Sequence, residues 1–380
     1  MKPLVNSDAP ATWENPYGYW PKETHWDLLQ AIYLDDNQDA LGRWREHCEI
    51  DTADAGMLRL LPLLYRRVKA DGIDIPEFTR LKSKYRYTVY RNNLTIHRLN
   101  GVVRALSDAQ IPVILVKGVS LLVNYYRDIG LRPMNDWDIS VPFDEYNRTC
   151  EILEARNFRP QIKVTESYRH VRSSQGWEDE DSFEIDLHWR CLPGHIRKDL
   201  PMVWNSVRKV SFRDLSVSTP SPEIDLAMVL IHGLEPNPTP PIRWVADAIE
   251  ILDSTDNINW QLFESLCPRD NFRQKLGPAF RFLKALRPEI DLPYAEEYPG
   301  ELNELADEFT PLKRNSGILP YMKASLSTYC STSARDPISI RIQNIPHYLR
   351  YHFSIEDHES LFDNLTSRLR RRLQIAKSTT

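Results

Sequence analysis

Two aspartates on either side of a tryptophan, Asp136 and Asp138, form the pattern in this chain that is best suited to chemistry. Apolar residues follow them as far as Val141, which predicts a β-strand on which residues two apart share one face. The carboxylates would then lie about 6.5 Å apart at the backbone, where they can share hard cations such as Mg²⁺. Two metal ions about 3.5–4 Å apart can activate an attacking oxygen and stabilise a leaving one. The same pair could also be two exposed acids on an edge strand, so the surrounding residues must distinguish a metal site from a solvated pair.

A third aspartate, Asp186, lies between two apolar residues in the alternating segment 183–189, which predicts another strand. Burying three acids together is costly unless a cation neutralises them, which favours a shared metal site of Asp136, Asp138 and Asp186. His188 shares the strand face of Asp186 and could orient its carboxylate or reach a substrate. A half-buried histidine bonded to the backbone is an equally open interpretation.

A second group of residues could bind phosphate. Lys117, Gly118 and Ser120 follow the apolar run at 113–116, where a strand would turn into a helix. Glycine lets a ligand approach the backbone, and the first N–H groups of a helix favour an anion. The serine hydroxyl and the lysine ammonium would add a donor and a positive charge. Arg132 could neutralise a phosphate or lie on the surface of a loop, and an ordinary turn glycine at Gly118 also remains open.

Helices and short strands must position these side chains. Apolar spacing predicts helices between residues 25 and 106, at 121–126 and at 146–153, and helices again after Pro220. Strands are predicted at 113–116, 137–141, 159–164, 168–172 and 183–189. This order predicts an α+β fold, in which a small mixed sheet has helices on one side. The predicted parts are an irregular arm (1–24), an N-terminal helical region (25–108), a core with the carboxylates (109–218) and a C-terminal helical domain (219–380).

Composition excludes several classes of protein. The 380 residues include only 13 glycines, none adjacent or one residue apart, so the glycine-rich loops of dinucleotide-binding proteins, P-loop proteins and kinases are absent. The net charge of −5 gives no global preference for nucleic acid or anionic membranes. The basic residues from Arg368 to Lys377 are interpreted as a solvated helix end. Scattered cysteines, an N-terminus unlike a signal peptide and the lack of an 18-residue apolar stretch predict a cytoplasmic protein with no disulfide-linked partner and no membrane association.

Three segments taken together resemble the large bacterial "uncharacterised nucleotidyltransferase" family of the DNA polymerase β superfamily: Val113–Ser120, Leu131–Ile139 and Glu184–Trp189. The similarity extends over the leading helices and over the segments around His232 and from Ile242 to Asp247, and so covers about Trp26 to Leu252. One departure concerns the glycine, which the superfamily commonly follows directly with glycine or serine. Here Val119 separates Gly118 from Ser120, which puts the role of this serine in doubt.

The resemblance implies a minimal nucleotidyltransferase fold and a Mg²⁺-dependent enzyme, with Mn²⁺ as a substitute metal. Asp136 and Asp138 would bind the metal that accompanies the triphosphate of an NTP such as ATP, and Asp186 would complete the site and take the acceptor's proton. The acceptor, attacking through a hydroxyl or phosphate, would be a small molecule, peptide, protein or RNA. Arg243 and Asp247 would line the cleft or form a pair on a helix surface.

Two other functions stay open at this point. A glycosyltransferase could use the Asp-x-Asp pair to bind Mn²⁺ and a nucleotide-sugar, although that would leave Lys117, Gly118 and Asp186 unexplained. A catalytically inactive nucleotidyltransferase fold could serve as a binding module, although all three carboxylates are present.

Overall fold

Segments from distant parts of the sequence contribute to each of two units. In the computed structural model, residues 21–192, 201–213, 215–234, 242–267, 271–293, 338–353, 355–364 and 366 are described. One unit comprises Met1–Ile139 with Met202–Thr310, and the other comprises Ser140–Pro201 with Pro311–Thr380. The predicted core, residues 109–218, is therefore divided between the two units.

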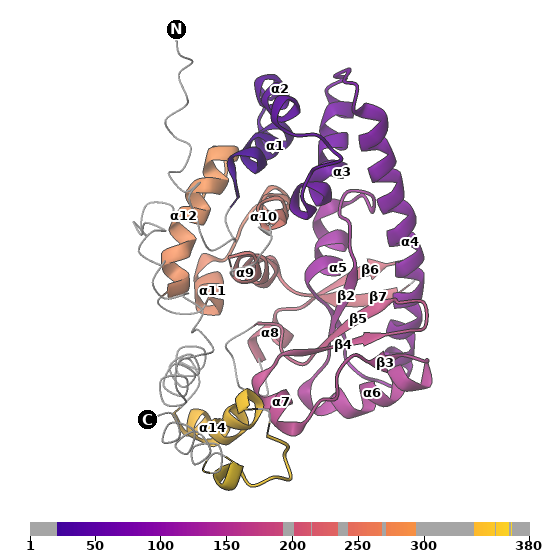
Figure 1. Cartoon of the computed structure of the whole chain (residues 1–380), viewed down its shortest axis with the longest axis vertical. Helices are drawn as coiled ribbons and strands as arrows, with labels where there is room; N and C mark the ends of the chain where they lie inside the picture. Colours follow the sequence, from indigo (N-terminus) through magenta and orange to yellow (C-terminus); the bar gives the residue numbers. More distant parts are fainter. Residues whose placement is uncertain are drawn as a thin grey trace, which may run out of the picture. The chain divides into compact units, whose positions relative to one another are not determined.

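Four helices occupy the region where the sequence predicts helices between residues 25 and 106 (Figure 1): α1 (Glu23–Tyr33), α2 (Gln38–His47), α3 (Ala55–Ala70) and α4 (Phe78–Asp108). Helix α3 begins after Asp54, whose side chain accepts a hydrogen bond from the Met57 N–H and so satisfies a free donor of the first turn. Helix α4 buries Leu99, Val102 and Leu106 at helical spacing, and it packs along α3. The helices predicted between residues 25 and 106 are confirmed.

The first unit contains a mixed sheet. Its strands are β1 (Ile114–Leu115), β2 (Asp136–Ser140, of which Ser140 belongs to the second unit), β6 (Arg208–Phe212) and β7 (Leu215–Thr219). Strand β1 pairs in parallel with β7, and β7 pairs antiparallel with β6. On its other side β1 neighbours β2, where the Val116 N–H donates to the Asp138 carbonyl at 3.1 Å. Strands β6 and β7 are not among the strands that the sequence predicts, although Val210, Ser211 and Phe212 alternate as a strand does.

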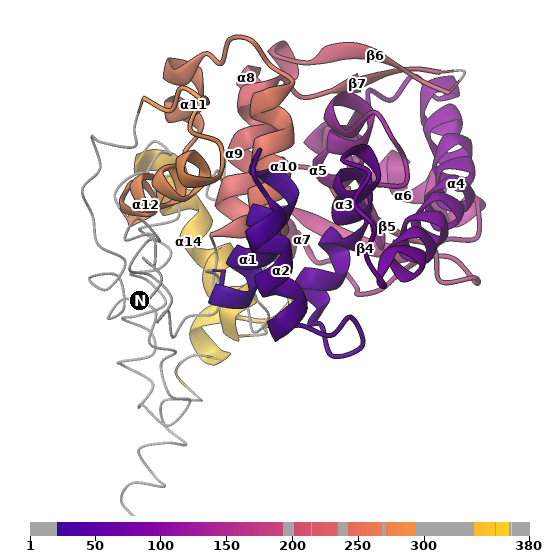
Figure 2. The ribbon, with the colours of Figure 1, turned by 90° about the horizontal axis from the view of Figure 1, so that it is seen from above.

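The first unit contains further helices besides α1 to α4. They are α5 (Lys117–Leu121), continued by a π-helix (Leu122–Tyr126), then α8 (Pro201–Asn205, of which Pro201 belongs to the second unit), α9 (Pro222–Gly233), α10 (Arg243–Asp253), α11 (Trp260–Leu266) and α12 (Asn271–Leu286). Figures 1 and 2 show α9 and α10 side by side. Gly233 permits this approach, because a Cβ there would lie only 2.2 Å from the Cβ of Trp244.

The second unit combines an antiparallel sheet with helices. Its elements are a 3₁₀ turn (Phe143–Glu145), α6 (Tyr146–Ala155), β3 (Arg159–Pro160), α7 (Glu166–Val171), β4 (Ser174–Glu178), β5 (Glu184–His188) and α14 (Ile338–Phe353). Strand β4 lies between β3 and β5, and Gly176 pairs with Asp186. The predicted strand at 168–172 is wrong, because these residues lie mostly in helix α7. The Thr165 side chain caps that helix by accepting from the Tyr168 N–H, a start signal that overrides the local strand pattern.

Some predictions concern residues outside the described ranges: most of the arm at 1–24, the proline-rich break before Ile242 and the basic run from Arg368. Within the described ranges, Cys48, Cys150, Cys191 and Cys267 are free thiols. No helix in that part of the chain combines the length and apolar character needed to cross a bilayer.

Candidate active site

Strand β2 presents the two aspartates differently to solvent. Trp137 is fully buried, Asp138 is buried and Asp136 is exposed. The Asp138 carboxylate, 4% exposed, lies 2.8 Å from the Lys117 ammonium. A buried carboxylate is costly without a positive partner, and the Lys117 ammonium supplies that positive charge here.

The start of α5 brings Lys117 to the strand. Lys117 has a φ of 48°, in the left-handed region that non-glycine residues rarely adopt. The residue before it, Val116, is hydrogen-bonded to the Asp138 carbonyl, so the turn holds the lysine beside the aspartate. The structure thus brings Lys117 into contact with Asp138. The sequence places both residues in the candidate site but does not predict this contact.

The structure requires a glycine at position 118 because neighbouring side chains leave no room for a Cβ, which differs from the predicted role of letting a ligand approach the backbone. A Cβ at this position would lie 2.7 Å from Nη1 of Arg132 and 3.1 Å from Sδ of Met134. The absent side chain therefore makes room for the Arg132 guanidinium. A valine here would therefore disturb the buried packing.

Arg132 is buried in an ion pair with Asp247 of α10. Its Nε and Nη2 donate to the two carboxylate oxygens at 2.9 and 2.8 Å, and the Tyr126 hydroxyl donates to Oδ1 at 2.6 Å. Burial alone would raise the pKa of Asp247, but the charge and hydrogen bonds of Arg132 together with Arg243 hold it below its ordinary value. The sequence does not predict this pair. Arg132 is buried, so it is not an arginine on the surface of a loop. Asp247 is bound closely by Arg132, whereas Nε of Arg243, its predicted partner on the helix, lies 3.9 Å away.

The Ser120 side chain is also buried and hydrogen-bonded within the protein. Its fully buried hydroxyl donates to Oδ2 of Asp225 on α9 at 2.8 Å, and the Tyr125 hydroxyl donates to the same oxygen. Arg208 lies 3.8 Å from this oxygen. Burial raises the pKa of Asp225 to about 7, against the opposing effect of these hydrogen bonds. The predicted phosphate donor therefore has a different partner.

Two residues of unassigned role lie near the acidic pair. Loss of hydration lowers the pKa of His232, the Lys117 and Arg243 charges lower it further, and Asp138 and Asp136 act in the opposite direction. These interactions place the end of α9 and the start of α10 within electrostatic range of β2. Arg243 also donates to the carbonyl of Pro133, just before the strand, at 2.9 Å. Burial lowers the pKa of Arg243 to about 10, with Arg132 contributing next.

Asp186 and His188 lie together on β5 in the second unit. Nε2 of His188 is 3.1 Å from Oδ2 of Asp186, and the histidine side chain is buried while the carboxylate is 25% exposed. Ile185 and Leu187 are fully buried, as the predicted alternation requires. The His188 carbonyl accepts from the N–H of Val141, the residue just after β2. His188 is therefore within reach of the Asp186 carboxylate, on the strand face that the sequence predicts.

The model of a protein family described as "Uncharacterised nucleotidyltransferase" matches residues 52–288. The chain belongs to this family. The match confirms the resemblance seen in the sequence, and it includes every candidate residue from Lys117 to Asp247. It ends before α14.

Solved structures similar to this nucleotidyltransferase chain include three with low identity. The antibiotic-resistance factor ANT(2'')-Ia is 13% identical, with 49% of this chain and 94% of that chain covered and a TM-score of 0.36. The lincosamide antibiotic adenylyltransferase LnuA is 14% identical, with 41% and 96% covered and a TM-score of 0.32. An antigenic nucleotidyltransferase-like protein from Paracoccidioides brasiliensis is 15% identical, with 50% and 87% covered and a TM-score of 0.32. No curated protein matches the chain.

Proposed function

We propose that this family member transfers a nucleoside monophosphate from an NTP to a hydroxyl or phosphate acceptor and releases pyrophosphate. The observation that carries the proposal is the acidic pair of β2, with a buried Asp138 bound to a lysine cation and an exposed Asp136 two residues before it. Family membership supplies the class of reaction.

The donor atoms of this pair suit magnesium. Carboxylate oxygens are the ligands that Mg²⁺ and Mn²⁺ prefer, and the position of the Lys117 ammonium 2.8 Å from Asp138 supports positive charge at this carboxylate. We propose that Asp136, Asp138 and Asp186 together hold Mg²⁺. The metal would neutralise the triphosphate and polarise the reacting phosphorus.

The chain's own groups would bind and orient the reactants. Asp186, oriented by His188, would accept the proton of the acceptor hydroxyl as its oxygen attacks the α-phosphorus in line. Lys117, Arg243 and His232 supply positive or hydrogen-bonding groups near the acidic pair for the triphosphate. Arg132 and Ser120 are omitted from this set because their polar atoms bind Asp247 and Asp225, buried carboxylates that are not proposed metal ligands. Lys117 is kept because its partner Asp138 is a proposed metal ligand, so the metal would take the place of the ammonium there.

A binding experiment tests the site. Isothermal titration with ATP, GTP, CTP and UTP in Mg²⁺ should show saturable binding of at least one nucleotide. Asp136→Asn should weaken that binding by at least roughly tenfold, because a metal ligand is lost, while the exposed acid Asp144 can be replaced by Asn as a matched control without effect. Equal binding by the Asp136 variant and the unmodified chain would contradict the proposal.

The acceptor class requires a labelling experiment. Incubation with each α-labelled NTP and an extract should transfer label to one class of molecule: small molecule, peptide, protein or RNA. We place this activity in the cytoplasm, where NTPs are available. Hydrolysis of a UDP-sugar without release of pyrophosphate from any NTP would instead identify a glycosyltransferase.

A further inference from the structure

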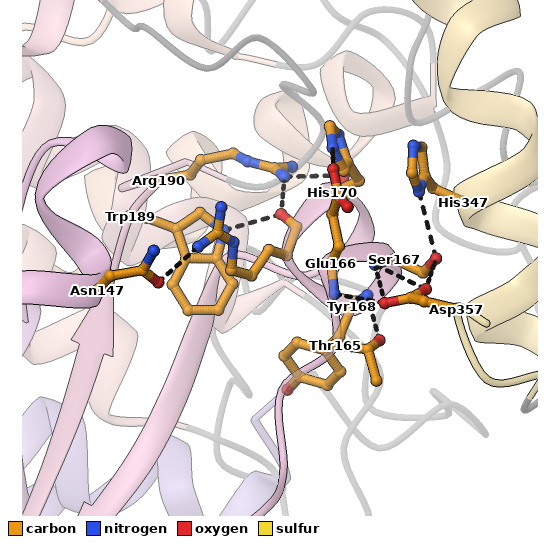
Figure 3. Close-up of polar contacts among 11 residues, drawn as sticks. Asn147, Thr165, Glu166, Ser167, Tyr168, His170, Trp189, Arg190, His347 and Asp357 are labelled. Carbon is orange, nitrogen blue, oxygen red and sulfur yellow. Dashed lines mark hydrogen bonds and ion pairs between the residues drawn. The ribbon is translucent and has the colours of Figure 1, made fainter. Parts of the chain in front are cut away.

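Helices α7 and α14 bring three potential metal ligands together within the second unit (Figure 3). Glu166 and His170 come from α7, and His347 comes from α14. Each offers one nitrogen or oxygen donor atom, and the three atoms lie within 4.8 Å of one another. The two imidazole rings stack with their centroids 4.1 Å apart and their planes at 15°. Oε1 of Glu166 lies 3.8 Å from Nε2 of His170.

A hydrogen-bonded chain fixes which nitrogen of His347 holds a lone pair. The single proton of the Ser167 hydroxyl is donated to the Asp357 carboxylate, which can only accept. Ser167 Oγ is 3.2 Å from Nδ1 of His347, so it must accept the proton of that nitrogen. The other nitrogen, Nε2, is then the deprotonated ligand atom. Metal-binding histidines are typically oriented in this way by a polar group on the second nitrogen.

The same contacts rule out a hydrolytic triad. In such a triad the histidine lies between the serine and the aspartate, whereas here Asp357 bonds directly to Ser167. Ser167 is also only 1% exposed, so its oxygen cannot reach a substrate.

Helix α7 is held at both ends, which positions its ligands in advance. At its start, the Glu166 N–H donates to Asp357 at 2.7 Å. At its end, Trp189 Nε1 donates to the Arg169 carbonyl at 3.0 Å, and Arg190 donates to the His170 carbonyl at 2.8 Å (Figure 3). Ligands on a fixed backbone lose little conformational entropy when they bind a metal.

We propose that Glu166, His170 and His347 bind one transition-metal ion of the Zn²⁺ type, which fastens α14 to α7. Two imidazoles and one carboxylate are a zinc donor set, and a fourth position remains for water. Ligand nitrogens 2.0–2.1 Å from a tetrahedral metal lie roughly 3.3 Å apart. Because a histidine lone pair lies in the plane of its ring, the stacked rings cannot both point at one ion, so His170 must turn out of the stack, and the exposed Glu166 must rotate, when the metal binds. Mg²⁺ prefers oxygen ligands, so this site and the acidic pair of β2 would select different metals. Because His347 lies outside the matched range 52–288, the proposal is independent of the proposed transferase activity.

Metal titration of the full chain tests the proposal. In excess Mg²⁺, which occupies oxygen-rich sites, metal-free protein should take up one equivalent of Zn²⁺ in competition with a chromogenic chelator. His170→Gln and His347→Gln should each abolish this uptake. The exposed His358, next to Asp357 in sequence, can be changed to Gln as the matched control and should have no effect. Ser167→Ala should weaken Zn²⁺ binding by roughly 10–100-fold because it releases the orientation of His347.

A second measurement uses the unmodified chain, so it tests the proposal even if the histidine variants fail to fold. Co²⁺ in place of Zn²⁺ should give the intense visible absorption of a four-coordinate N/O site. Absence of Zn²⁺ uptake, an octahedral Co²⁺ spectrum, or uptake unchanged by both histidine substitutions would overturn the proposal.

Discussion

The buried pair of Arg132 and Asp247 allows a direct test of what Arg132 does. The substitution Asp247→Asn keeps the side-chain volume but removes the negative charge that faces the guanidinium. The side chains of Arg132 and Asp247 are only 5% and 6% exposed, so water cannot replace the lost partner. Arg243 lies nearby and would add to the uncompensated positive charge.

The structure indicates the size of the effect. Breaking a buried ion pair by removing one partner typically costs about 3–5 kcal/mol, because the remaining charge stays desolvated. With a urea dependence of about 3 kcal/mol/M, the unfolding midpoint should fall by roughly 1–2 M. The pair of Asp253 and Arg287 is the control, since Asp253 lies at the end of the same helix α10 and its ion pair is much more exposed, at 32% and 27%. Asp253→Asn should therefore cost only about 0–1 kcal/mol.

The assay combines urea unfolding with hydrogen exchange. Faster exchange in peptides of α10 and α5 would assign the lost stability to the first unit, which matters because the chain has two units. The double variant Arg132→Met with Asp247→Leu should recover much of the stability, because a buried pair can often be replaced by apolar residues. It should also retain NTP binding. If Asp247→Asn costs less than about 1 kcal/mol, or if the stable double variant loses NTP binding, the structural role argued for Arg132 is refuted.

Two further predictions concern the same interior. Gly118→Ala should destabilise the chain by about 1–3 kcal/mol in urea unfolding, because the new Cβ meets Arg132, and an unchanged midpoint would contradict this close contact. The raised pKa of Asp225, about 7, means that the folded state favours the protonated acid, so its stabilising contribution is present below pH 4 and is lost as the pH rises towards 7. Urea midpoints between pH 4 and 8 should show this loss, worth at most about 4 kcal/mol, and Asp225→Asn should remove the dependence. A pH profile that the substitution leaves unchanged would mean that another group titrates.

The sequence predicts elements well where local signals are strong. The helical spacing around Leu99 and the alternation around Asp186 are local patterns, and both elements appear in the structure. The hairpin of β6 and β7 was missed because its strands are short and carry polar residues. At Tyr168 a local strand pattern competed with the cap of Thr165, and the cap determined the structure.

The functional residues were harder to predict, because their partners lie far away in sequence. Ser120 and Arg132 have the right types and spacing for phosphate binding, yet each donates to an aspartate of a later helix, α9 or α10. Nothing within the segment from Lys117 to Asp138 indicates those partners. Only the pairing of α9 and α10 with the start of α5 and the loop before β2 explains why the two groups point inward.

This loss of two predicted phosphate ligands changes which cations can meet a triphosphate. Arg132 neutralises Asp247 closely, so Arg243 keeps only a distant carboxylate at 3.9 Å and has a pKa lowered to about 10. A cation that lacks a close counter-charge gains more from an incoming anion than one already paired, because less existing interaction must be broken. The buried pair thus leaves Arg243 without a close carboxylate, which supports its proposed role in binding the triphosphate. On this argument Arg243→Met should weaken NTP binding more than it lowers stability, which is the opposite of the order expected for Arg132→Met.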